Sequence, residues 1–117
     1  MPTPTVFLIT RGGRTVLYGT DLLDMREEGY AVLQGRTIDV LILDQTYGEG
    51  RNAGGHLDAG GVRTIIGRLR EMGAVGDATR AYATHISHEG NGTHRQMRAL
   101  ARAHGYDVAY DGLIVTI

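Results

Sequence analysis

The chain has 117 residues, a net charge of −1, 42% apolar residues and 21% charged residues, which allows one domain with a core of its own. Because the charges are interspersed, they form neither a nucleic-acid-binding stripe nor a membrane-binding patch, and the absence of cysteine excludes disulfides and thiolate metal sites. No apolar run approaches the roughly 18 residues of a membrane span, and the first ten residues lack the features of a signal peptide, so we expect a cytoplasmic protein.

The N-terminal part of the chain predicts two strands and a helix. Thr5 to Thr10 is rich in β-branched residues and predicts a strand, and Thr15 to Gly19 predicts its return after the turn signal at residues 11–14. Residues 22–34 predict a helix, which is weakened because Gly29 lies inside it.

The centre of the chain predicts a buried strand followed by a long helix. Residues 38–43 form a nearly continuous apolar run, which is typical of a strand covered on both faces. A glycine-rich loop from Gln45 to Gly55 precedes a helix from about Asp58 to Met72, whose apolar residues recur at spacings of three and four. Gly73 is a natural stop for this helix.

The next segment predicts a short strand, a polar loop and a third helix. Arg80 to Thr84 predicts the strand, and residues 85–92 predict the loop. Thr93 and Gln96 match a capping box at the start of the helix, and Gly105 ends it. The predicted apolar stripe of this helix consists of Met97, Leu100 and Ala101.

The C-terminal residues predict a second hairpin, with strands at residues 106–110 and 113–117 joined at Asp111-Gly112. The complete order is then ββαβαβαββ, which favours an α/β layered fold. The hairpins at both ends argue against a purely parallel sheet.

Three polar residues each follow a predicted strand: Asp21, Asp44 and His85. In open α/β sheets, ligands bind in the crevice beyond the strand ends. His56 lies in the glycine-rich loop and His88 follows three residues after His85. Histidine and aspartate without cysteine suit zinc, manganese or iron.

Structural roles explain the same residues equally well. Asp21 could cap a helix or a turn, and Asp44 could bond the backbone of its own loop. His56 and His88 could be partly buried hydrogen-bonding residues. His94 and His104, at the two ends of the third predicted helix, are interpreted as surface residues. The glycine-rich loop matches neither the P-loop nor the dinucleotide-binding pattern.

A family resemblance favours functional roles for these residues. The chain resembles the C-terminal half of metallo-β-lactamase-fold hydrolases, particularly the branch that contains the phosphonate-pathway cyclic phosphodiesterase. The resemblance extends from about Val6 to Ile117. The segments that carry it, in order, are Tyr18-Gly-Thr-Asp21, Asp39-Val-Leu-Ile-Leu-Asp44, Gly54-Gly-His56, Ala83-Thr-His85-Ile-Ser-His88 and Val108-Ala-Tyr-Asp-Gly-Leu113.

The resemblance implies a role for each matching residue. Asp21 matches an aspartate that bridges two metal ions, and His85 matches the last histidine ligand. His56 matches a histidine near the substrate phosphate, His88 lies in the same active-site loop, and Asp44 matches an acidic residue behind the ligands. A carboxylate can bridge two cations about 3.5–4 Å apart, and such a pair activates water and holds a phosphoryl group.

One segment that is typical of the family is absent from this sequence. The family's His-x-His-x-Asp-His segment, which supplies most metal ligands, has no match here. We therefore expect one α/β domain, spanning residues 1–117, that forms the C-terminal portion of an αββα sandwich, with a mixed sheet and helices on one face. The other face should be apolar and uncovered, a surface for the N-terminal half or a second copy.

Three functions remain open from the sequence. The first is metal-dependent hydrolysis of a small phosphodiester with zinc or manganese, incomplete in this chain alone. The second is a non-catalytic metal-binding or self-associating module. The third is nucleotide binding by the Gln45–Gly55 loop, which the missing phosphate-loop pattern disfavours. A membrane or nucleic-acid partner is not expected.

Overall fold

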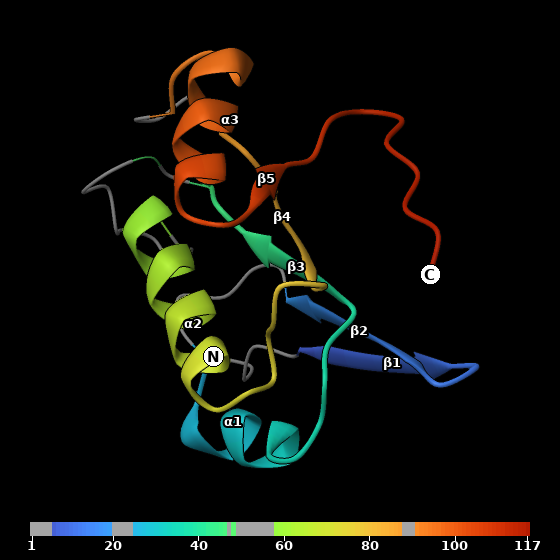
Figure 1. Ribbon diagram of the computed structural model, residues 1–117. Coiled ribbons are helices and arrows are strands. Elements are labelled where there is room, and N and C mark those ends of the chain that lie inside the picture. The colour runs from blue at the N-terminus through green and yellow to red at the C-terminus, as the bar shows by residue number, and fades with distance from the viewer. Residues whose placement is uncertain (1–5, 20–24, 47, 49–57, 88–90) are drawn as a thin grey trace, which may run out of the picture.

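The computed structural model describes residues 6–19, 25–46, 48, 58–87 and 91–117. These residues form one mixed sheet with helices packed on it (Figure 1). In chain order the elements are β1 (Phe7–Arg11), β2 (Arg14–Gly19), α1 (Glu27–Leu33), β3 (Val40–Asp44), α2 (Ala59–Glu71), β4 (Arg80–Thr84), α3 (His94–Ala103) and β5 (Asp107–Val108).

The strands lie in the sheet in the order in which they occur in the sequence, β1-β2-β3-β4-β5. β1 pairs antiparallel with β2, and every later pair is parallel. The tight turn between β1 and β2 needs a left-handed backbone at Gly12 and Gly13, whose φ angles are 57° and 77°. The predicted mixed sheet is confirmed.

All three helices cover the same face of the sheet, as Figure 1 shows. One cluster of buried side chains joins the strands to the helices, because alternate strand residues point into it. From the sheet it includes Leu17, Leu41, Leu43, Ala81, Ala83 and Val108, and from the helices Tyr30, Leu33, Val62, Ile65, Ile66, Leu69 and Ala101. The prediction of helices on one face is therefore confirmed.

The second face of the sheet carries exposed apolar side chains. Phe7, Ile9 and Tyr18 have 57%, 50% and 38% of their surface exposed, and the alternation along β1 and the Phe7–Tyr18 register put all three on this face. The C-terminal segment reaches the same face, because the Arg80 guanidinium donates a hydrogen bond to the Thr116 carbonyl. The apolar surface on β1 and β2 matches the uncovered face expected from the sequence.

Local signals define the two long helices. The Asp58 carboxylate accepts a hydrogen bond from the Gly61 amide at 2.7 Å and so caps α2. At the start of α3, the Thr93 hydroxyl accepts from the Gln96 amide while the Gln96 side chain accepts from the Thr93 amide, which confirms the predicted capping box.

Helix α1 is shorter than the predicted segment. It begins at Glu27, after residues 20–24, which are outside the described residues. Its internal Gly29 has a packing reason: a Cβ there would come within 2.9 Å of the Met25 side chain. The glycine that weakened the prediction is thus the residue that lets the helix lie close to Met25.

Two expectations for the C-terminal region are wrong. Residues 113–117 form no strand, although a turn does form at Asp111-Gly112. A hairpin needs a face to bury, and Ile114 is 86% exposed, so its second strand gains nothing from pairing. Leu100 is 53% exposed rather than packed into the core, since the buried face of α3 is narrow and centred on Ala101.

No helix within the described ranges is long and apolar enough to cross a membrane.

Candidate functional site

The candidate site lies at one edge of the sheet, where parallel strands end side by side. β2, β3, β4 and β5 all run in the same direction, so their carboxyl ends share an edge. The final pair of the β3–β4 register joins Asp44 to Thr84. The residues that follow these two strands are therefore brought together by the sheet itself.

Asp44 is completely buried at this edge. Its Oδ1 atom accepts hydrogen bonds from the Thr46 amide at 2.8 Å and from the Thr46 hydroxyl at 2.5 Å. The expectation that Asp44 bonds the backbone of its own loop is thus confirmed, as an Asx-type turn. The same carboxylate also fixes the orientation of the Thr46 hydroxyl.

His85 follows β4 in an unusual backbone conformation. Its φ angle is 58°, and among the described residues it is the one non-glycine residue with positive φ. Such conformations are strained and concentrate at functional sites. The His85 Nδ1 atom lies 2.8 Å from the Thr46 hydroxyl and 3.8 Å from Asp44 Oδ1, and 44% of the side chain is exposed. One side of the ring is therefore anchored, while the residue stays accessible to solvent.

The loops after β3 and β4 are joined by hydrogen bonds to the Thr46 carbonyl. It accepts from the Ser87 amide and from Asn91 Nδ2, both at 3.0 Å, and from the Ser87 hydroxyl. The Gln45 amide adds a bond to the Thr84 carbonyl at 2.9 Å. These bonds make the two loops one structural unit and hold His85 against Thr46.

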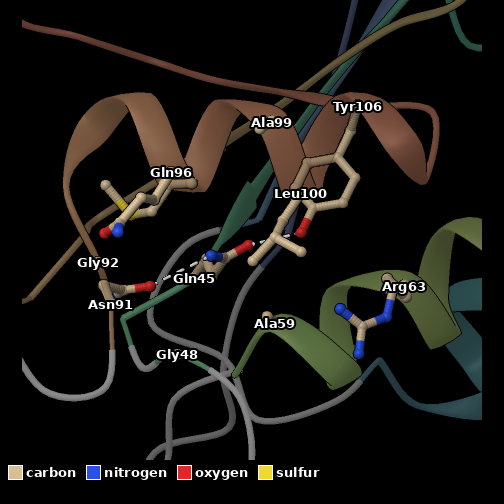
Figure 2. A pocket seen from close by; sticks show the side chains of 11 residues that line it. Gln45, Gly48, Ala59, Arg63, Asn91, Gly92, Gln96, Ala99, Leu100 and Tyr106 are labelled. Carbon is tan, nitrogen blue, oxygen red and sulfur yellow. Dashed lines mark hydrogen bonds between the residues drawn. The ribbon is translucent and has the colours of Figure 1, made fainter.

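A pocket of about 420 Å³ lies beside this unit, between α2 and α3. Figure 2 shows Arg63 of α2 on one side, Leu100 of α3 facing it, and Gln45 and Asn91 on the side of the loops. The exposed Leu100 side chain lines this pocket. The described residues that line it are Gln45, Gly48, Ala59, Arg63, Asn91, Gly92, Gln96, Met97, Ala99, Leu100 and Tyr106.

The buried amide of Gln45 links the pocket to the loops. Its Oε1 accepts a hydrogen bond from the Tyr106 hydroxyl at 2.8 Å, and its Nε2 donates to Asn91 Oδ1 at 3.3 Å. No motif in the sequence indicated that Gln45, Thr46, Asn91 and Tyr106 are site residues. The position of Gln45 and Thr46 directly after a strand-end aspartate was the signal that could have found the first two.

Comparison with solved structures identifies the fold. The chain is similar to a diphosphatase of the PhnP family, with a TM-score of 0.67 and 25% identity over 89% of this chain and 36% of that one. It is also similar to the metallo-β-lactamase-fold protein YhfI from Bacillus subtilis, with a TM-score of 0.65 and 21% identity over 92% of this chain and 42% of that one. The chain has the fold of the C-terminal half of a metallo-β-lactamase-fold protein.

The relationship to metallo-β-lactamase-fold proteins is carried by structure rather than by closely related sequences. No protein-family model matches the chain, and no curated protein matches it. The chain spans well under half the length of either similar structure. The two structural neighbours show that the chain has a metallo-β-lactamase-like fold, as the sequence motifs implied.

The structure describes only some of the predicted site residues. It describes His85 and the supporting Asp44, whereas Asp21, His56 and His88 lie outside the described residues and remain predictions. His94 and His104 are exposed, as expected for surface residues.

Metallo-β-lactamase-fold proteins generally bind divalent metals. Among the residues that the structure describes, no three histidine, cysteine, aspartate or glutamate side chains gather in a group that could hold an ion. His85 by itself fits the role of one ligand, because an imidazole anchored through one nitrogen is the arrangement that metal-binding histidines adopt.

Proposed function

We propose that this chain is part of a metal-dependent hydrolase that cleaves small phosphodiesters by means of metal-activated water. The observation that carries the proposal is His85, which sits at the carboxyl edge of the sheet with positive φ and with Nδ1 held by Thr46. The structural likeness to a PhnP-family diphosphatase supports chemistry at a phosphate group.

Two residues are proposed as metal ligands, Asp21 and His85. Carboxylate oxygen and imidazole nitrogen suit zinc or manganese, and the cysteine-free chain offers no thiolate to compete. When bound, two such ions would supply an activated water and hold the phosphoryl oxygens. The fully buried Asp44 stands behind His85 and keeps that ring in place through Thr46.

His56 and His88 are proposed as catalytic residues. Hydrolysis of a phosphodiester produces a leaving alkoxide, which is a poor leaving group unless it receives a proton. An imidazole can give that proton near neutral pH, or can stabilise the negative charge that develops.

We propose that hydrolysis requires more of the fold than this chain. It spans 36% and 42% of the two similar structures, and its own proposed ligands, Asp21 and His85, are too few to hold two ions firmly. The exposed apolar face that includes Phe7, Ile9 and Tyr18 would pack against the second sheet of the complete sandwich.

Metal content of the purified chain tests the ligand assignment. After incubation with zinc or manganese and removal of excess ion, we expect bound metal in the wild type and a large loss in both His85→Ala and Asp21→Ala. His104→Ala removes an exposed imidazole at the end of α3 and should leave the metal content unchanged. Equal metal content in all four proteins would remove both residues from the ligand set.

Turnover of bis-p-nitrophenyl phosphate tests the dependence on the rest of the fold. With added manganese or zinc, we expect no significant hydrolysis by this chain alone. Activity that disappears in His85→Ala would support the hydrolase but contradict the need for further residues.

A second candidate function, a self-associating module, is favoured by the same exposed face. Light scattering after size-exclusion chromatography should show association of the isolated chain that Phe7→Asp abolishes. Val32→Asp is the matched control, because Val32 is equally exposed, at 59%, but lies on α1. A defined dimer that binds no metal would favour the module, and a stable monomer would contradict an associating face.

A further inference from the structure

Thr46 occupies a position that its role as a loop residue does not explain. Its hydroxyl lies 2.5 Å from Asp44 Oδ1 on one side and 2.8 Å from His85 Nδ1 on the other. The three side chains therefore form a continuous hydrogen-bonded series that starts at a fully buried carboxylate and ends at a solvent-accessible imidazole.

The protons in this series can be assigned by counting donors. A threonine hydroxyl has one proton to donate and two lone pairs that accept. Asp44 Oδ1 already accepts the Thr46 amide, so it acts as an acceptor, and the hydroxyl proton goes to this oxygen. The Thr46 oxygen can then interact with His85 only by accepting, which requires a proton on His85 Nδ1.

We infer that Thr46 is a positioning residue that holds His85 in the tautomer with its proton on Nδ1. In this tautomer the lone pair is on Nε2, so Nε2 is the nitrogen that would bind a divalent cation. The assignment of the cation rests on the proposed function, whereas the assignment of the tautomer rests on the geometry alone. Thr46 itself need not touch the ion or the substrate.

A direct bond from His85 to Asp44 cannot replace this arrangement. The distance from His85 Nδ1 to Asp44 Oδ1 is 3.8 Å, which exceeds hydrogen-bonding range. The Thr46 hydroxyl fills the gap, and its backbone is fixed because the Thr46 carbonyl accepts from Ser87 and Asn91. The imidazole thus meets an acceptor whose position is set before any metal arrives.

Nitrogen NMR of the metal-free chain tests the tautomer directly. In ¹⁵N-histidine-labelled protein at a pH where the imidazoles are neutral, the His85 ring should show a protonated Nδ1 and an unprotonated Nε2; His85→Ala assigns the signals. A His85 ring protonated on Nε2 in the wild type would overturn the inference, whether or not the chain binds metal.

Two substitutions separate the hydroxyl from the shape of the side chain. Thr46→Val keeps the branched shape but removes the hydroxyl, so the His85 signals should shift away from the Nδ1-protonated pattern. Thr46→Ser keeps the hydroxyl and should keep that pattern. Spectra of both variants first confirm that they fold. A wild-type pattern in Thr46→Val would overturn the inference, because the tautomer would then not depend on the hydroxyl.

Zinc titration against a chelating indicator gives a second readout. Loss of a group that orients a metal-binding histidine weakens affinity by about 10- to 100-fold, so we expect such a loss in Thr46→Val and near-wild-type binding in Thr46→Ser. Equal zinc affinity in the wild type and Thr46→Val would overturn the positioning role. If the wild type binds no zinc but shows the Nδ1 proton, the tautomer assignment stands and the proposed metal function fails.

Discussion

Removal of one hydroxyl group, in Tyr106→Phe, tests whether the network behind the pocket contributes to folding. The Tyr106 hydroxyl donates to Gln45 Oε1 at 2.8 Å, and the two residues are 5% and 4% exposed. The substitution keeps the ring in place and takes away that donor. Because Gln45 is buried, water cannot readily replace the lost hydrogen bond.

The magnitude follows from this burial. A buried acceptor that loses its donor costs about 1–3 kcal/mol of folding free energy. Unfolding entropy is about 2.1 cal/mol/K per residue, which for a chain of this length gives roughly 0.25 kcal/mol/K. The melting temperature of Tyr106→Phe should therefore fall by about 4–12 °C.

Thermal unfolding followed by circular dichroism measures this change, and Tyr110→Phe is the matched control. It removes the same atom from a side chain that is 55% exposed, so it should change the free energy of unfolding by no more than about 0.5 kcal/mol. Equal melting temperatures for the two variants would show that the Tyr106–Gln45 hydrogen bond contributes no net stability.

Further substitutions probe stability elsewhere. Leu69→Ala, at a position with no exposed surface, should cost about 2–5 kcal/mol in urea unfolding, and a loss under about 1 kcal/mol would contradict a tightly packed α2 interface. Thr93→Ala removes the cap of α3 and should cost about 1 kcal/mol; a Thr93→Ser variant that is equally destabilised would argue against capping. Partial burial raises the pKa of Asp107, but hydrogen bonds from Arg98, Val108 and Arg102 outweigh it, so the pKa is lowered overall. The ionised form of Asp107 therefore stabilises the fold at pH values above the ordinary pKa of aspartate. This stabilisation is lost as the pH falls through the lowered pKa of the folded state. The stability advantage of the wild type over Asp107→Asn, measured by urea unfolding, should shrink in acid, and a constant difference would contradict the ion pairs.

Local sequence signals were sufficient to predict the two long helices. The apolar spacing and the stop at Gly73 predicted α2 to within one residue at each end, and Thr93 with Gln96 predicted the start of α3. These signals act within a few residues of the chain, so they work without knowledge of the tertiary fold. The prediction of the C-terminal hairpin was wrong because a strand depends on contacts beyond its neighbours in the chain. Asp111-Gly112 does form a turn, but a strand after it needs a partner and a buried face that local sequence cannot supply.

Sequence signals likewise predicted only part of the candidate site. The sequence placed Asp44 and His85 after strands, and the parallel register then put their strands side by side. It did not indicate that the Thr46 hydroxyl lies between them, because that contact joins residues 39 positions apart. The supporting residues Gln45, Asn91 and Tyr106 were missed for the same reason.

The sequence was sufficient to predict the order of the elements as far as β5, the cap of α3 and the family motifs, since each depends on residues close together in the chain. Only the tertiary structure shows which polar side chains meet at the edge of the sheet and which residues of β1 and β2 form the exposed apolar face that the family resemblance implied. Those features arise from strand register and layer packing, which bring distant segments into contact, and no short stretch of sequence encodes them.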